Sequence, residues 1–66
     1  MKLGTIVQLK VKLEAGYRDR GMLVATEAYT DFHGTRNWLY VRWFDSDGRP
    51  DTETKKHHAE ELEEAS

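Results

Sequence analysis

The sequence predicts a small all-β domain of four to five antiparallel strands that closes into a barrel. Short runs of strand-forming residues recur along the chain, with turn residues between them, at the spacing of about 8–12 residues that is typical of small barrels. The chain has 66 residues and no Cys, which excludes disulfides and thiolate metal sites. A domain of this size therefore depends on aromatic packing or on a partner, and closure protects its sheet edges.

The first predicted strand covers residues 4–13, because Val7, Leu9, Val11 and Leu13 alternate with polar residues at the period of a half-buried strand. Gly16 then marks a loop. The second strand covers residues 22–29, although its alternation is poor and a helix competes with it. We expect Met22, Val24 and Thr26 on one of its faces, and Leu23 and Ala25 on the other. In the following loop, residues 30–35, we expect a positive φ at Gly34.

The third predicted strand, residues 37–44, carries the strongest signal, with four aromatic side chains and one β-branched side chain in eight positions. Alternation assigns Leu39, Val41 and Trp43 to the core, and places the other side chains on the opposite face. Asp47-Gly48 is a preferred hairpin turn. Pro50 cannot donate to a sheet, so it suits a strand start or an edge.

The remaining residues predict an exposed edge strand over residues 51–56 and leave the C-terminal conformation open. Residues 55–65 contain good helix formers, but their apolar stripe is thin. The alternative is a single helical turn over residues 59–61, followed by a short strand that carries Leu62 inward. We expect one domain over residues 1–66, with residues 59–66 an acidic, partly disordered tail.

The charge is nearly balanced, with 10 Lys and Arg residues, 12 Asp and Glu residues and a formal net charge of −2. Four of the acidic residues lie in residues 59–66, so the rest of the chain is slightly basic. This balance differs from the strongly basic face of a dedicated DNA-binding domain. No apolar run reaches the length of a membrane span, and we expect no signal peptide.

Four segments together resemble the SH3-like barrels, and more narrowly the short SH3-like proteins of tailed-phage genomes. The segments are Gly-Thr-Ile-Val-Gln-Leu at 4–9, Gly-Met-Leu-Val-Ala at 21–25, Tyr-Val-Arg-Trp-Phe-Asp-Ser-Asp-Gly at 40–48 and Glu-Glu-Leu-Glu at 60–63. The resemblance implies a viral accessory or virion-associated protein, located in the host cytoplasm or the virion. Residues 17–20 lack the acidic and aromatic density of domains that read proline-rich peptides.

No catalytic, phosphate-binding or zinc-protease motif is present, so we expect a non-enzymatic protein without a cofactor. Asp45 and Asp47 begin like a calcium loop, but Lys56 occupies the position of the closing glutamate. His57 and His58 are adjacent, so they point to opposite faces of a strand and do not chelate one ion. We expect no metal site.

The best candidate for function is the face of the third strand that does not enter the core. It combines three aromatic side chains with an arginine, residue types that are enriched at interface hot spots. We therefore predict a surface that binds another protein or further copies of this chain, formed by Trp38, Tyr40, Arg42 and Phe44. The competing interpretation is that these side chains pack under residues 31–35 or under the C-terminal segment.

The alternative function is a nucleic-acid-binding module. In this alternative the aromatic side chains stack on bases while basic side chains contact phosphates. The basic residues that we assign to this alternative are Lys10, Lys12, Arg18, Arg20 and Arg42.

Overall fold

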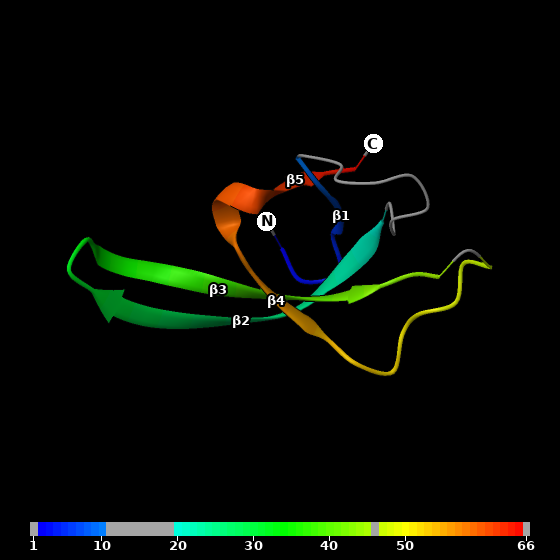
Figure 1. Cartoon of the computed structure of the whole chain (residues 1–66), viewed down its shortest axis with the longest axis horizontal. Helices are drawn as coiled ribbons and strands as arrows, with labels where there is room; N and C mark the ends of the chain where they lie inside the picture. Colours follow the sequence, from blue (N-terminus) through cyan, green and yellow to red (C-terminus); the bar gives the residue numbers. More distant parts are fainter. Residues whose placement is uncertain (1, 11–19, 46, 66) are drawn as a thin grey trace.

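The computed structural model describes residues 2–10, 20–45 and 47–65, and over these residues the chain is all-β, as predicted. Its elements are β1 (Ile6–Leu9), β2 (Gly21–Asp31), β3 (Gly34–Trp43), β4 (Lys55–His58), a 3-10 turn η1 (Ala59–Glu61) and β5 (Leu62–Glu64). The five antiparallel strands form one open sheet in the order β4-β3-β2-β1-β5 (Figure 1).

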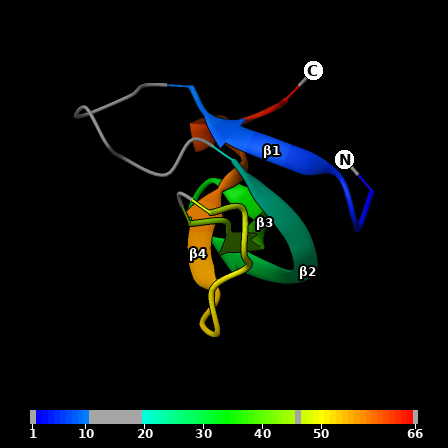
Figure 2. The same cartoon turned by 90° about the vertical axis from the view of Figure 1, so that its right-hand side faces the viewer.

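The β2–β3 hairpin dominates the shape, which measures 39 by 21 by 21 Å. Figure 1 shows the turn of this hairpin projecting away from β1, β5 and η1. In the perpendicular view, β4 runs beside β3, while β1 lies at the other side of the hairpin (Figure 2). We call residues 25–38 the arm, because no side chain in this part of the hairpin is buried.

Over the described residues, the core lies at the base of the hairpin and consists of six buried side chains from four strands. They are Val7, Leu23, Leu39, Val41, Trp43 and Leu62, with Leu9 packed against them. The predicted inward positions of β3 are confirmed, and so are those of Val7 and Leu62. Gly21 belongs to the same layer, because a Cβ there would lie 2.5 Å from Val41 Cγ1 and 2.9 Å from Trp43 Cε3.

The predicted faces of β2 hold for Met22 and Leu23 but are wrong for Ala25 and Thr26, because the strand contains a β-bulge. Leu23 pairs with Val41 and Ala25 pairs with Tyr40, so Val24 is an extra residue without a partner on β3. The extra residue reverses the alternation. Leu23 is therefore fully buried, and Thr26, three residues later, lies opposite Leu39 on the same side of the sheet.

The β2–β3 turn is tighter than the predicted loop over residues 30–35. The strands continue to the pair Asp31–Gly34, which leaves only Phe32 and His33 in the turn. Asp31 Oδ1 accepts a hydrogen bond from His33 N at 2.8 Å, and Gly34 has φ 104°, as predicted. Phe32 is fully exposed.

The turn at residues 45–48 forms as predicted, and Asp45 organises it. Its carbonyl oxygen accepts a bond from Gly48 N, and its Oδ1 accepts bonds from Asp47 N and Arg49 N. Pro50 then forms an isolated bridge with Phe44, in keeping with an edge position.

The edge strand predicted over residues 51–56 is wrong in its position. β4 begins only at Lys55 and ends at His58. The reason is that Arg42 Nη1 donates to the carbonyl oxygens of Asp51 and Thr52, at 2.8 and 3.3 Å. These hydrogen bonds hold the β3–β4 connection in a bend, so β4 begins later in the sequence than predicted.

The first predicted strand is described only in part, whereas the C-terminal segment is described almost to its end. β1 covers Ile6–Leu9, and the predicted inward positions Val11 and Leu13 and the loop at Gly16 lie outside the described residues. The turn-plus-strand alternative for the C-terminus is confirmed, with η1 followed by β5. Residues 59–64 of the expected acidic tail are therefore part of the ordered structure.

Candidate functional site

The strand register brings five side chains together on the face of the sheet opposite the core. On β4, His58 pairs with Trp38 and Lys56 pairs with Tyr40. On β2, Glu27 pairs with Trp38, so Tyr29, two residues further along β2, is the diagonal neighbour of Trp38. We call this group the outer aromatic face: Tyr29, Trp38, Tyr40, Lys56 and His58. Because three adjacent strands supply its members, backbone pairing holds them in place.

Three of these rings form a stack across β2, β3 and β4. The Tyr29 and Trp38 ring centroids are 5.1 Å apart with an interplanar angle of 24°, and the Trp38 and His58 centroids are 4.1 Å apart. The hydroxyl of Tyr29 lies 3.3 Å from His58 Nδ1, which ties the two ends of the stack together. All three side chains remain half-exposed.

A lysine places a positive charge on this ring surface. Lys56 Nζ lies 4.8 Å from the centroid of the Trp38 ring and 6.0 Å from that of Tyr40. Both distances are within the range of cation–π attraction, which keeps the ammonium group over the rings. Lys56 is exposed, so its charge stays accessible to a carboxylate or a phosphate.

Tyr40 carries a hydrogen bond that changes its acidity. Its hydroxyl donates to Glu27 Oε2 at 3.1 Å. This hydrogen bond raises the pKa of Tyr40 above its usual value, with smaller contributions from desolvation and from the negative charge of Glu27. Tyr40 is therefore a neutral donor at physiological pH, and its ring is fixed against the β2 strand.

The four residues predicted for the partner surface differ in their contacts. Trp38 and Tyr40 belong to the outer aromatic face. Arg42 is half-buried, and its guanidinium donates to backbone carbonyls of the β3–β4 connection. Phe44 is half-buried beyond the end of β3, where its backbone pairs with Pro50.

Tyr29, Lys56 and His58 belong to the face and are missing from the sequence prediction. The signal that finds Tyr29 is the two-residue turn at Phe32 and His33, because turn length sets hairpin register. Lys56 and His58 need the register of β4, which depends on the bend that Arg42 holds.

The two adjacent histidines serve different faces, as predicted. His57 lies on the core side, where Trp43 Nε1 donates to its Nε2 at 3.2 Å and its Nδ1 lies 2.8 Å from Glu61 Oε2. Both bonds form together when Nδ1 carries the hydrogen and donates to Glu61. His58 lies in the outer stack. Over the described residues, no group of three or more His, Asp or Glu side chains is arranged to hold a metal ion.

Three of the basic residues of the nucleic-acid alternative, Lys10, Arg20 and Arg42, lie in the part of the chain that the structure describes. Lys10 and Arg20 are exposed, but the Lys10 amide bonds to the carbonyl of Glu61 and the Arg20 carbonyl accepts from Phe44. Neither backbone position lies on the strands of the outer aromatic face. Lys12 and Arg18 lie outside the described residues.

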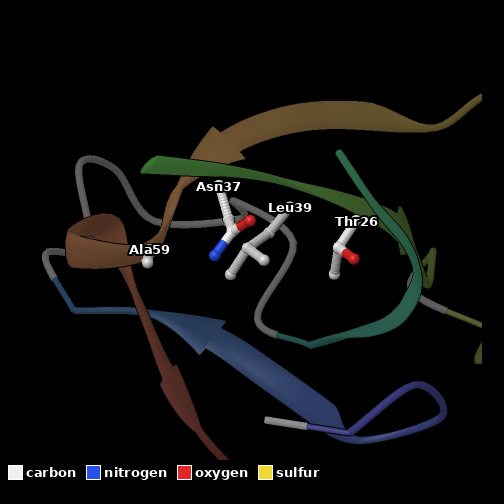
Figure 3. A pocket seen from close by; sticks show the side chains of 4 residues that line it. All are labelled: Thr26, Asn37, Leu39 and Ala59. Atoms are coloured by element: carbon white, nitrogen blue, oxygen red, sulfur yellow. The ribbon is translucent and has the colours of Figure 1, made fainter. Parts of the chain in front are cut away.

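The opposite side of the hairpin has an open pocket of about 310 Å³. Its lining comes from Thr26, Asn37 and Leu39 on the hairpin and from Ala59 in η1 (Figure 3). Among the described residues that line the pocket none is titratable, and Thr26 carries the one hydroxyl.

We compared the chain with known protein families, curated sequences and solved structures. No protein family, curated protein sequence or solved structure matches the chain. Among the described residues, none forms a helix with the length and apolar character that crossing a bilayer requires.

Proposed function

We propose that this chain is a non-enzymatic protein–protein interaction module, which docks through its outer aromatic face on another protein or on further copies of itself. The observation that carries the proposal is the half-exposed stack of Tyr29, Trp38 and His58. Rigid aromatic side chains bury a large area on binding and lose little conformational entropy, which is why they dominate interface hot spots. Here cross-strand register and the Tyr29–His58 contact orient the rings in advance.

We further propose that the fold is an SH3-like barrel. The edge strands β4 and β5 follow each other in sequence and are separated only by the three residues of η1. A short connection between the two edges of a sheet favours a curved sheet whose edges approach each other. The order β4-β3-β2-β1-β5 with such a turn supports the resemblance that the sequence suggests. A role as a phage accessory or virion-associated protein, in the host cytoplasm or the virion, rests on that resemblance.

The chemistry of the face defines the kind of partner. Trp38 and Tyr29 offer ring surface to apolar side chains, and Lys56 offers a positive charge beside them. A protein surface that presents an apolar side chain next to a carboxylate fits this arrangement. Desolvation of the Lys56 charge would then be compensated by a direct ion pair.

The nucleic-acid alternative has one observation in its favour. A cation placed 4.8 Å from the Trp38 ring resembles the combination of stacking and charge used by single-strand binders. Against it, Arg42 is engaged with backbone carbonyls and Glu27 adds a negative charge beside Tyr40. We therefore treat nucleic-acid binding as the competing outcome of the experiment.

The experiment is quantitative binding with matched variants. The full chain is immobilised, the proteins that it retains are purified, and each is titrated against wild type, Trp38→Ala, Tyr40→Ala and Leu3→Ala. Leu3 is a matched control, because it is a large exposed apolar side chain on the segment before β1. We expect Trp38→Ala to weaken binding by roughly 10- to 30-fold, as hot-spot truncations do, and Leu3→Ala to leave it unchanged.

Two further measurements complete the design. The solution mass of the chain alone reports docking on its own copies, and titration with single- and double-stranded DNA and RNA at low ionic strength reports nucleic-acid binding. The proposal is wrong if the chain is a strict monomer and if Trp38→Ala and Tyr40→Ala bind every purified partner as tightly as wild type. Salt-dependent nucleic-acid binding that Trp38→Ala abolishes would replace it with the alternative.

A further inference from the structure

We infer that the open edge of β2 is a self-association site, where the arm pairs antiparallel with the arm of a second copy. β2 has 11 residues, but β1 pairs only with Gly21 and Met22. Leu23 bonds to Thr5 and Gly4 through its backbone, and beyond it no described strand lies on that side of β2. β4 pairs with β3 only as far as Trp38, and Figure 1 shows the turn end of the hairpin continuing beyond the other strands. The edge is separate from the outer aromatic face, so this inference goes beyond the proposed function.

Hairpin geometry identifies the backbone groups that face the open side. In a two-residue hairpin the pair that closes the turn, here Asp31 and Gly34, exchanges hydrogen bonds. Bonded and non-bonded pairs then alternate along an antiparallel ladder. The N–H and C=O groups of three residues therefore point away from β3: Thr26, Ala28 and Thr30.

The composition of this edge differs from that of the other two edges of the sheet. β4 carries Lys55 and Lys56 and β5 carries Glu63 and Glu64, the kind of charges that discourage edge-to-edge pairing. By contrast, the three residues of the β2 edge whose backbone groups are open, Thr26, Ala28 and Thr30, are small and uncharged, and Glu27 is the one charged residue between them. The arm is thus less protected against pairing than the other two edges.

The spacing of these groups and the charge between them favour a register with a two-fold axis at Ala28. Ala28 then faces Ala28 of the second copy, and Thr26 faces Thr30 on either side. Each of these three facing pairs exchanges two bonds, so the pairing forms six backbone hydrogen bonds. Centring the axis on Glu27 would use the same open backbone groups, but it would place two carboxylates opposite each other.

The same register is compatible with the side chains of the outer face. Glu27 lies opposite Tyr29 of the second copy, and the two Tyr29 rings become diagonal neighbours. Diagonal positions on antiparallel strands are within reach of aromatic side chains. Beyond Trp38 each hairpin is a two-stranded ribbon, which is marginal in water, and the pairing would make the two ribbons part of one larger sheet. The occupant that the observations favour is therefore a second copy of this chain.

The experiment is a charge swap at the two-fold axis, measured by sedimentation equilibrium on the full chain. Wild type is expected to shift with concentration from 7.7 kDa toward twice that mass. Ala28→Lys and Ala28→Glu each place like charges in contact, so each is expected to weaken self-association by roughly tenfold or more. An equimolar mixture of the two variants is expected to associate again, because the charges then attract.

Controls separate this site from folding effects and from the outer aromatic face. Asn37→Lys adds the same charge on the β3 residue paired with Ala28, and it is expected to retain the wild-type mass. Ala28 is exposed, so circular dichroism of Ala28→Lys is expected to match wild type. A wild type that stays at 7.7 kDa up to millimolar concentration would overturn the inference, as would a mixture that fails to associate. Self-association that Trp38→Ala abolishes and Ala28→Lys spares would also overturn it, and would support the proposed function instead.

Discussion

The base of the β2–β3 hairpin and its arm use the same two strands for different purposes. At the base, β2 and β3 contribute four of the six buried side chains. In the arm, residues 25–38, no side chain is buried, although the strands stay paired to the turn. The base therefore follows the usual rule that apolar burial stabilises a fold, and the arm does not.

The difference teaches where function is to be sought. Burial does not explain why the arm is long, or why it places Tyr29 and Trp38 on its surface. Large aromatic side chains that stay partly exposed on paired strands are available for contact with another molecule. The core stabilises the fold, and the arm contributes Tyr29 and Trp38 to the docking surface that we propose.

The largest expected effect is the loss of a core side chain at the base. Leu23 is fully buried, so Leu23→Ala should destabilise the fold by about 2–5 kcal/mol. Thr26→Ala, three residues later in the arm, should change stability by only about 0.5 kcal/mol or less. Urea denaturation followed by circular dichroism measures both. Equal losses in the two variants would mean that the arm belongs to the same cooperative core.

A second, smaller loss of stability is expected when alanine replaces either of two glycines, which are required for different physical reasons. Gly21→Ala at the base forces a Cβ against Val41 and Trp43, and we expect a loss of about 1–3 kcal/mol from overpacking. Gly34→Ala in the arm meets no atom within 4 Å, but its φ of 104° is unfavourable for alanine. We expect a loss of about 1 kcal/mol there.

A second substitution, Val41→Ala, provides the control, because it should reduce the stability loss of only one of the two glycine variants. Val41→Ala removes the methyl groups that the new Cβ contacts, so in its presence Gly21→Ala should cost less than it does alone. Gly34→Ala should cost the same in both backgrounds, because its penalty is backbone strain. Thermal unfolding of the four variants and of Val41→Ala distinguishes the two causes, and identical behaviour would contradict this explanation.

The smallest expected effect is a change in acidity on the outer face. The hydrogen bond to Glu27 raises the pKa of Tyr40, so Tyr40 should deprotonate at a higher pH than an ordinary tyrosine, whose pKa is about 10. A raised folded-state pKa contributes stability below the unfolded pKa, and this contribution is lost as the pH rises through the folded value. The effect is therefore confined to strongly alkaline solution.

NMR of ring-labelled tyrosine measures this pKa directly. Glu27→Gln removes the carboxylate, so it should lower the pKa of Tyr40 toward its usual value. If Tyr40 titrates at the same pH in wild type and in Glu27→Gln, the hydrogen bond at 3.1 Å does not persist in solution.

The sequence was sufficient to predict the class of fold and the two faces of β3. Alternation in residues 37–44 separates Leu39, Val41 and Trp43 from the outer side chains, because nothing interrupts that strand. The flanking turns also follow from local chemistry, since Asp45 and Gly34 act within a few residues of themselves. Local signals predicted the local structure.

What could not be predicted depends on contacts between distant residues. The bulge at Val24 reverses the faces of β2, and no residue in this run signals its position. The start of β4 depends on Arg42 reaching the carbonyls of Asp51 and Thr52. The prediction therefore found two members of the outer aromatic face, Trp38 and Tyr40. Lys56 and His58 join the face through the register of β4, and Tyr29 joins it through the register that the β2–β3 turn sets.

The most direct test of the difference between core and docking surface uses the two tryptophans of β3. Trp43 is 3% exposed and packs in the core, whereas Trp38 is half-exposed on the outer aromatic face. The measurement is the free energy of unfolding of Trp43→Ala and of Trp38→Ala, each determined by urea denaturation against wild type.

We expect Trp43→Ala to cost about 3–5 kcal/mol, because it removes a buried aromatic side chain. Trp38→Ala should cost less, about 2 kcal/mol, because it removes two ring pairs at roughly 1 kcal/mol each. A loss at Trp38 as large as the loss at Trp43 would contradict the account, because the stack of Tyr29, Trp38 and His58 would then be a second core and not a docking surface.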